Sequence, residues 1–142
     1  MTDRVLVPFD DSEPARTALE EACSLFSDAE LVVLHVLDAS DAGSAIDGAG
    51  TEDLQVAEDE LAEGLFADAH EIAAECGRTI ETRVVRGQPA REIRRFAVDR
   101  DVDHVVMGSH GRSGLSRILV GSVAEEVIRN SPVSVTIARG TT

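Results

Sequence analysis

Four glycines lie within the fifteen residues GSHGRSGLSRILVGS that run from 108 to 122. Three of them, followed by a serine, have the spacing G-x2-G-x9-G-S: Gly108, Gly111, Gly121 and Ser122. A glycine where a strand ends or a helix begins lets backbone N–H groups face an anion without a Cβ in the way. A helix that starts at Ser122 adds the positive end of its dipole. The pattern predicts a phosphate site built mainly from backbone.

A plainer interpretation of the same residues stays open at this point. Each glycine could serve only a turn, and Ser122 could cap the helix that follows. Ser122 and Glu125 have the S-x-x-E spacing of a capping box. If Glu125 reached back to the helix start, its charge would weaken a bound phosphate.

Two familiar phosphate motifs are excluded. A P-loop needs a lysine after its second glycine, and this chain contains no lysine. The dinucleotide fingerprint G-x-G-x-x-G is also missing, because Gly108, Gly111 and Gly114 are spaced by three.

Asp10 and Asp11 follow the first apolar run, VLVPF. Paired acids there could hold magnesium, as in a receiver domain. Such a domain also needs an aspartate after its third strand and a lysine after its fifth, and neither is present. Asp10 could hydrogen-bond a ribose hydroxyl or cap the following helix, and Asp11 is expected to be a cap or a surface acid.

Few side chains near the glycines could take part in chemistry. Arg112 and Arg117 could screen the phosphates of an anionic ligand, although Arg117 could equally pair with surface acids. His110 is a general base by residue type, but it has no identified nucleophile or metal partner and is interpreted as a polar loop residue. We assign no catalytic residue, and the residues leave the metal ligands unknown. His35 is expected to be a satisfied core or edge histidine.

The charge of the chain limits its partners. The net charge is -14, from 27 acids against 13 bases that are all arginine. Such a surface repels phosphate backbones, which argues against nucleic-acid binding. Acidic, lysine-free surfaces are typical of adaptation to high salt, so we expect a haloarchaeal or similar source.

The length of 142 residues and an apolar fraction of 43% predict a single globular domain, residues 1–142. No apolar run is long enough to span a bilayer, and the N-terminus lacks the features of a signal peptide. A cytoplasmic protein without membrane contact is expected. Cys23 and Cys76 lack metal-ligand spacing and are expected to be buried, reduced thiols.

Apolar periodicity predicts alternating strands and helices. Strands are expected at 5–9, 31–37, 79–86, 104–107 and 133–138, and helices at 14–26, 54–76, 89–100 and 122–130. This order predicts an α/β fold with a five-stranded parallel doubly wound sheet, Rossmann-like, of strand order 3-2-1-4-5. Ligands of such sheets bind beyond the carboxyl ends of the strands where the order reverses, here between the first and fourth strands.

Three stretches resemble the universal stress protein family: VLVPFDDSEPA, LVVLHV and VVMGSHGRSGLSRILVGSVAEEVIRNSPVSVTIAR. The resemblance covers nearly the whole chain. The last stretch carries in full the glycine pattern of the family's ATP-binding branch.

The resemblance implies a site for ATP, or for AMP or ADP. In it Asp10 would bind the ribose, Pro8 would lie beside the nucleotide and Val36 would meet adenine through its backbone. Six residues would surround the phosphates, with Mg²⁺ or Mn²⁺ bridging them: Met107, Gly108, Gly111, Gly121, Ser122 and Val123.

The resemblance also implies a homodimer that pairs the last strand, Val133–Ala138. The expected function is that of an adenine-nucleotide-binding regulatory protein of the stress response. A slow ATPase or self-phosphorylating enzyme that uses the same site is the alternative, and a nucleotide-free scaffold is a third possibility that conflicts with the intact glycine pattern.

Overall fold

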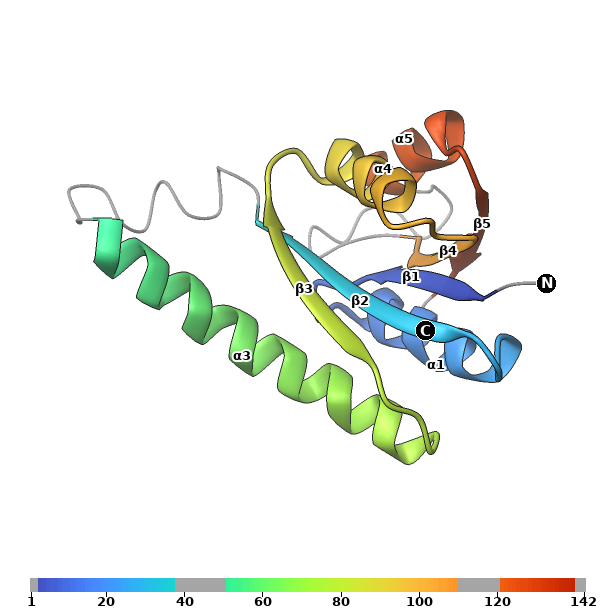
Figure 1. Ribbon diagram of the computed structural model, residues 1–142, viewed down its shortest axis with the longest axis horizontal. Helices are drawn as coiled ribbons and strands as arrows, with labels where there is room; N and C mark the ends of the chain where they lie inside the picture. The colour runs from blue at the N-terminus through green and yellow to red at the C-terminus, as the bar shows by residue number, and fades with distance from the viewer. Residues whose placement is uncertain (1–2, 38–50, 110–120, 140–142) are drawn as a thin grey trace.

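The computed structural model describes residues 3–37, 51–109 and 121–139 (Figure 1). Strands and helices alternate along these ranges, with a helix following each of the first four strands. The elements are β1 (Arg4–Pro8), α1 (Glu13–Leu25), β2 (Glu30–Leu37), α3 (Thr51–Glu75), β3 (Glu81–Arg86), α4 (Pro89–Asp99), β4 (His104–Gly108), α5 (Ser122–Asn130) and β5 (Ser134–Ala138).

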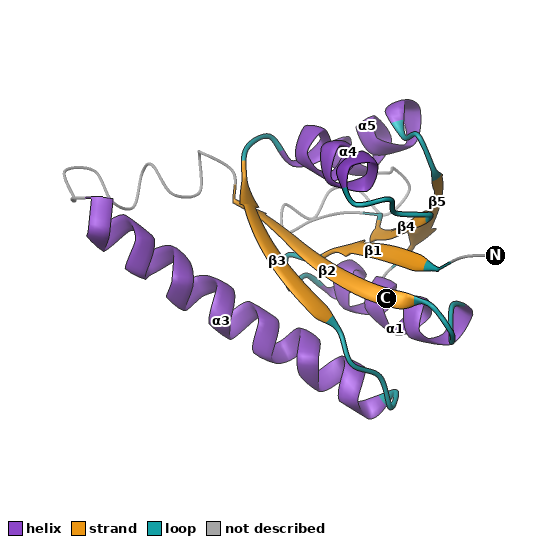
Figure 2. Cartoon of the chain, viewed as in Figure 1, coloured by secondary structure: helices purple, strands orange, loops and turns teal. Residues whose placement is uncertain are grey.

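The five strands form one parallel sheet in the order β3-β2-β1-β4-β5. Helices α1 and α3 cover one face of the sheet, and α4 and α5 cover the other (Figure 2). The expected doubly wound α/β fold and its strand order 3-2-1-4-5 are therefore confirmed.

The almost unbroken apolar character of the central strands follows from this layering. In β1, Val5 and Val7 pack into the core on the α1 side, and Leu6 packs into the core on the α4 side. A strand covered on both faces has no polar side, so alternation disappears from its sequence.

Every strand differs from its expected range by one or two residues. Strand β1 spans Arg4–Pro8 rather than 5–9, β2 begins at Glu30 rather than at 31, and β4 ends at Gly108 rather than at 107. Strand β3 begins at Glu81 rather than at 79, and it forms one edge of the sheet, where Val84 is 39% exposed. Strand β5 begins at Ser134 rather than at 133, because the hydroxyl of Ser131 accepts from the N–H of Val133 (3.1 Å) and donates to its carbonyl (2.7 Å). These contacts hold Val133 in the turn that precedes the strand.

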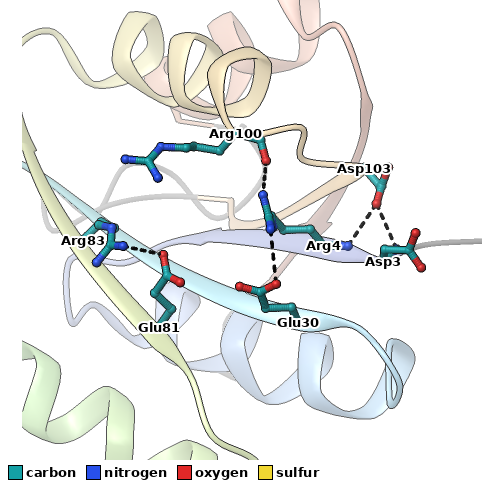
Figure 3. Close-up of polar contacts among 7 residues, drawn as sticks. All are labelled: Asp3, Arg4, Glu30, Glu81, Arg83, Arg100 and Asp103. Atoms are coloured by element: carbon teal, nitrogen blue, oxygen red, sulfur yellow. Dashed lines mark hydrogen bonds and ion pairs between the residues drawn. The ribbon is translucent and has the colours of Figure 1, made fainter.

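A polar network joins the amino-terminal ends of the strands (Figure 3). The carboxylate of Asp103 accepts the backbone N–H groups of Asp3 and Arg4, each at 2.9 Å. The guanidinium of Arg4 contacts Glu30 at 3.4 Å and donates to the carbonyl of Arg100. The first strand is thereby fastened to β2 and to the turn before β4, at the end of the sheet opposite its carboxyl edge.

The two cysteines differ in exposure. Cys23 is buried on α1, as expected, but Cys76 is exposed, so the expectation of a buried thiol was wrong there. Cys76 follows the last residue of α3, in a turn whose next residue, Gly77, has φ 71°. The residue lies where the helical periodicity has already ended.

Among the helices that the structure describes, none combines the length and the apolar character needed to cross a membrane.

Candidate functional site

Strands β1 and β4 are neighbours at the point where the strand order reverses. They end at Pro8 and Gly108. The turn that carries Asp10 and the start of the glycine-rich segment therefore lie at the same edge of the sheet, as the sequence predicts. This edge is where open parallel sheets bind ligands.

Asp10 shapes the turn between β1 and α1. One of its carboxylate oxygens accepts the N–H of Ser12 at 3.1 Å. Ser12 is the N-cap of α1, and its hydroxyl accepts the N–H of Ala15 at 3.3 Å. Of the two roles left open for Asp10, the structure thus shows a turn contact just before the helix, with the cap supplied by Ser12. Asp10 is half-buried.

Asp11 is a surface acid and not a cap. Its backbone has φ 61°, and its carboxylate pairs at 2.8 Å with Arg16, which also contacts Asp68 of α3 at 3.2 Å. Partial burial, followed by a hydrogen bond with Asp68, raises the pKa of Asp11 above its ordinary value of 3.8, although Arg16 opposes the rise. Through Arg16, Asp11 links the turn before α1 to Asp68 of α3.

Gly108 serves a purpose that the sequence did not indicate. A Cβ added there would stand 2.7 Å from the carbonyl carbon and from the Cβ of Pro14, and 2.9 Å from the nitrogen of Ala15. The side of Gly108 that lacks a Cβ therefore faces the first turn of α1, not an open space for an anion. The glycine allows the helix after β1 to pack directly against the end of β4.

Ser109, considered from the sequence only as a hydroxyl that the enzyme alternative could use, joins three parts of this edge. Its N–H donates to the carbonyl of Ala138 in β5 at 2.8 Å, and its carbonyl accepts the N–H of Gly121 at 2.6 Å. The only signal for this role in the sequence is its position, directly after the last residue of β4. Ser109 and Gly121, the residues that flank the segment 110–120, are thereby joined at the carboxyl edge.

The start of α5 decides between the two interpretations of Ser122. The N-cap is Gly121, and no side chain of the described residues caps the helix; Ser122 is its exposed first residue. Glu125 pairs with Arg129 one turn later, at 2.7 Å, and does not reach back. The capping box is therefore wrong, and among the described residues no carboxylate or hydroxyl caps the first N–H groups of α5.

The remaining expected residues that the structure describes lie along the same edge. Pro8 ends β1, and Val36 and Met107 are the penultimate residues of β2 and β4. Val123 is half-buried on the first turn of α5.

The backbone of Val36 has a defined orientation. Because Phe9 donates to the carbonyl of Leu34 at 2.8 Å, the polar groups of Leu34 face β1. Alternation along the strand gives Val36 the same orientation, two residues beyond the last β1 pair, Pro8 with Leu34. The N–H and C=O of Val36 thus point to the side of β2 on which β1 lies, at a level beyond the last residue of β1.

Five residues considered in the sequence lie outside the described residues: His110, Gly111, Arg112, Gly114 and Arg117. His35 is buried, and its Nδ1 lies 2.8 Å from the carbonyl oxygen of Phe9, which confirms a satisfied core histidine. Within the described ranges, no group of three or more His, Cys, Asp or Glu side chains could hold a metal ion.

Comparison with solved structures agrees with this architecture. The protein MJ0577 of Methanocaldococcus jannaschii superposes with a TM-score of 0.81 and 31% identity, covering 100% of this chain and 99% of that one. A universal stress protein solved in complex with cAMP superposes with a TM-score of 0.71 and 24% identity, covering 99% and 98%.

Sequence comparison identifies the family. The chain is 34% identical to universal stress protein MJ0531 of Methanocaldococcus jannaschii, covering 96% of this chain and 81% of that protein. It is 36% identical to universal stress protein YxiE of Bacillus subtilis, covering 98% and 100%. The family model "Universal stress protein family" matches residues 1–139. The chain therefore belongs to the universal stress protein family.

Proposed function

We propose that this protein binds an adenine nucleotide, ATP foremost, at the carboxyl edge between β1 and β4, and acts as a homodimeric regulator in the stress response. The observation that carries the proposal is the start of α5. Its N-cap is a glycine, its first residue is exposed, and the acid in its first turn, Glu125, is paired with Arg129.

The phosphates would lie at this helix start. Backbone N–H groups and the positive end of the helix dipole attract an anion there, and Gly121 places no side chain between them and a ligand. Gly111, Ser122 and Val123 would complete the phosphate contacts, with Arg112 supplying a positive charge to a protein of net charge -14. Because the open side of Gly108 faces α1, Gly108 would take part only through its backbone groups.

The nucleoside would lie toward β2. The carboxylate of Asp10 would bind the ribose, and the outward N–H and C=O of Val36 would meet adenine, with Pro8 beside it and Met107 at the phosphate side. The family membership supports this choice of ligand, since another family member has been solved with cAMP. At 24% identity that structure supports only the shared fold. The roles proposed for Asp10, Val36, Pro8 and Met107 therefore rest on where these residues lie in the present structure.

A bridging Mg²⁺ or Mn²⁺ fits this site if phosphate oxygens and water supply most of its ligands. The described residues contain no cluster that could hold the ion by itself. When bound, the cation would neutralise part of the phosphate charge.

The proposed homodimer would pair β5 of two copies. Strand β5 ends the sheet, and an unpaired edge is a template for a second strand. The acidic chain is proposed to bind no nucleic acid, to act in the cytoplasm and to form one domain over residues 1–142. A binding function is preferred to turnover because no base for water activation has been identified among the described residues.

The decisive experiment is to denature freshly purified protein in acid and to identify released nucleotide by mass and by absorbance. The chain contains neither tryptophan nor tyrosine, so its own absorbance interferes little. About one adenine nucleotide per chain supports the proposal. If the purified protein is empty, titration with ATP and Mg²⁺ at high salt decides, and an absence of saturable binding there would overturn it.

A further inference from the structure

The two cysteines are brought together by the packing of α1 on α3. Cys23 lies on the last turns of α1, 6% exposed, in the same core cluster as Leu65 and Ala69 of α3. Cys76 lies one residue beyond the end of α3, and its thiol is close enough to that of Cys23 to help raise the pKa of the Cys23 thiol. The two thiols, 53 positions apart in the sequence, therefore lie near one another.

Arg78 fixes this arrangement through the backbone. Its guanidinium donates to the carbonyl oxygens of Cys23 (3.0 Å) and Phe26 (3.1 Å), and also to that of Ala29. Its own N–H donates to the carbonyl of Ala73 at 2.8 Å. The turn that carries Cys76 is thus held against the end of α1 by contacts that do not involve either thiol.

We propose that Cys23 and Cys76 form an oxidisable dithiol, a modification site at which a peroxide closes a disulfide between α1 and α3. The site is independent of the proposed nucleotide site, which lies at the other end of α1.

The difference in exposure between the two thiols determines which of them reacts first with the peroxide. Cys76 is exposed and meets the peroxide first: its sulfur attacks one peroxide oxygen, the O–O bond breaks, and a sulfenic acid and one water are formed. The sulfur of Cys23 then attacks the sulfur of Cys76, the S–O bond breaks, and the oxygen leaves as a second water with the thiol proton. Two thiols and one hydrogen peroxide thus give one disulfide and two waters.

The environment of Cys23 suits the second role. Burial, followed by the nearby thiol of Cys76, raises the pKa of the Cys23 thiol to about 11. A thiol that stays protonated and covered reacts poorly with a dissolved oxidant, so Cys23 is spared in the first step. Its attack on the Cys76 sulfenic acid relies on the high effective concentration that the fold gives the pair. The disulfide would close the chain between residues 23 and 76 and lock the end of α3 onto α1.

The test treats the reduced full-length protein with equimolar hydrogen peroxide, blocks remaining thiols with N-ethylmaleimide and measures intact mass. Cleavage after glutamate releases Cys23 within residues 22–30 and Cys76 within 76–81, so a cross-link joins two peptides. The expected product has lost two hydrogen atoms, carries no maleimide and contains that cross-linked pair. Cross-links only between two copies of Cys76, oxidation of Cys76 with Cys23 still reduced, or no reaction would overturn the proposal.

Two variants and a comparison in urea test whether the disulfide forms because the fold holds the two thiols together, or because both thiols react readily wherever they lie. Cys23→Ala should accumulate a dimedone-reactive sulfenic acid at Cys76, and Cys76→Ala should leave Cys23 unoxidised over the same time. The folded protein should form the disulfide at least about 10-fold faster than the same chain in urea, because the fold raises the effective concentration of the thiols. Equal rates in the two conditions would show that the fold does not place the pair for reaction.

Discussion

Gly108 and Pro14 are packed so closely that a Cβ on residue 108 would stand 2.7 Å from the carbonyl carbon of Pro14. Real Cβ contacts are not this short, so α1 can meet the end of β4 only where residue 108 is glycine. The contact joins the turn that contains Asp10 to the strand that leads into the glycine-rich segment. Two parts of the proposed site are thereby held in one position.

Gly108→Ala should disturb both the fold and the site. The clash is with backbone, which cannot rotate away, so a loss of about 1–3 kcal/mol in the free energy of unfolding is expected. Gly64→Ala is the matched control: Gly64 lies exposed within α3, and an added Cβ there would meet nothing within 4 Å. That variant should gain about 0.5–1 kcal/mol. Urea titrations measure both, and a Gly108→Ala protein as stable as the wild type would contradict the packing described.

Ser122→Asp should separate ligand binding from stability. An acid on the first turn of a helix stabilises it by about 0.3–1 kcal/mol, through the helix dipole. The same charge would repel a phosphate, so ATP affinity should fall at least about tenfold, or about 1.4 kcal/mol.

Calorimetric titration of the Ser122→Asp protein with ATP and Mg²⁺ measures the affinity, and urea unfolding measures the stability. Ser27→Asp adds the same charge at an exposed turn beyond the carboxyl end of α1 and should leave affinity unchanged. If both variants bind ATP as tightly as the wild type, the phosphates do not lie at α5.

The open edge of β5 can be tested with proline. The N–H of Ser109 donates to the carbonyl of Ala138, so Ala138 directs its polar groups to β4. Alternation then directs the N–H of Val135 away from the sheet. Val135→Pro should leave the hydrogen bonds within the sheet intact and prevent a second copy from pairing, so the proposed dimer should become a monomer by light scattering after size exclusion.

The opposite edge supplies the control for Val135→Pro. Gly87 donates to the carbonyl of Leu37 at 3.0 Å, and alternation therefore directs the N–H of Val84 in β3 outward as well. Val84→Pro should remain dimeric. A Val135→Pro protein that is folded and still dimeric would place the interface elsewhere.

Arg78→Lys tests the clamp at the end of α1. An ammonium group keeps the charge but cannot reach the three carbonyl oxygens that the planar guanidinium contacts. Loss of about 1.5–3 kcal/mol in the free energy of unfolding is expected, the range for a hydrogen bond to a charged group. Urea unfolding under reducing conditions measures it, so that the thiols do not contribute. An unchanged midpoint and slope would mean that charge alone, and not the guanidinium geometry, matters there.

His104 should make stability depend on pH. Its Nε2 lies 2.7 Å from the hydroxyl of Thr136, and partial burial lowers the pKa of the imidazole below its ordinary value of 6.5. The unfolded chain therefore takes up the proton first, so stability from this group is complete above pH 6.5 and declines as pH falls from there to the lower folded pKa. The difference in unfolding free energy between wild type and His104→Gln should shrink between pH 7 and 5, measured by urea unfolding at each pH; parallel curves would exclude the effect.

The sequence predicted the fold well because the central strands are buried on both faces. Val5, Leu6 and Val7 form an apolar run that only a covered strand explains. The positions of Asp10 and Gly108 at one edge followed from the strand order. The start of β3 was the least accurate, since edge strands have weaker burial patterns, and the start of β5 was misplaced because the Ser131 turn has no apolar periodicity.

The contacts made across the chain could not be predicted in this way. The clash at Gly108, the ion pair that withdraws Glu125 from Ser122 and the meeting of Cys23 with Cys76 depend on how distant elements pack. The capping-box spacing was a local signal, and the pairing with Arg129 one turn later overrode it. The high-salt source suggested by the acidic, lysine-free composition stays a prediction.

The hydrogen bond between Ser109 and Gly121 has a consequence for how this protein can diversify. Ser109 and Gly121, which flank the segment 110–120, are joined to each other and, through Ser109, to β5 by backbone contacts alone. Insertions or substitutions between them are therefore expected to change the proposed ligand site while these contacts stay in place. A replacement sequence could be inserted between Ser109 and Gly121, because the carbonyl of Ser109 and the N–H of Gly121 are present whatever the residues between them.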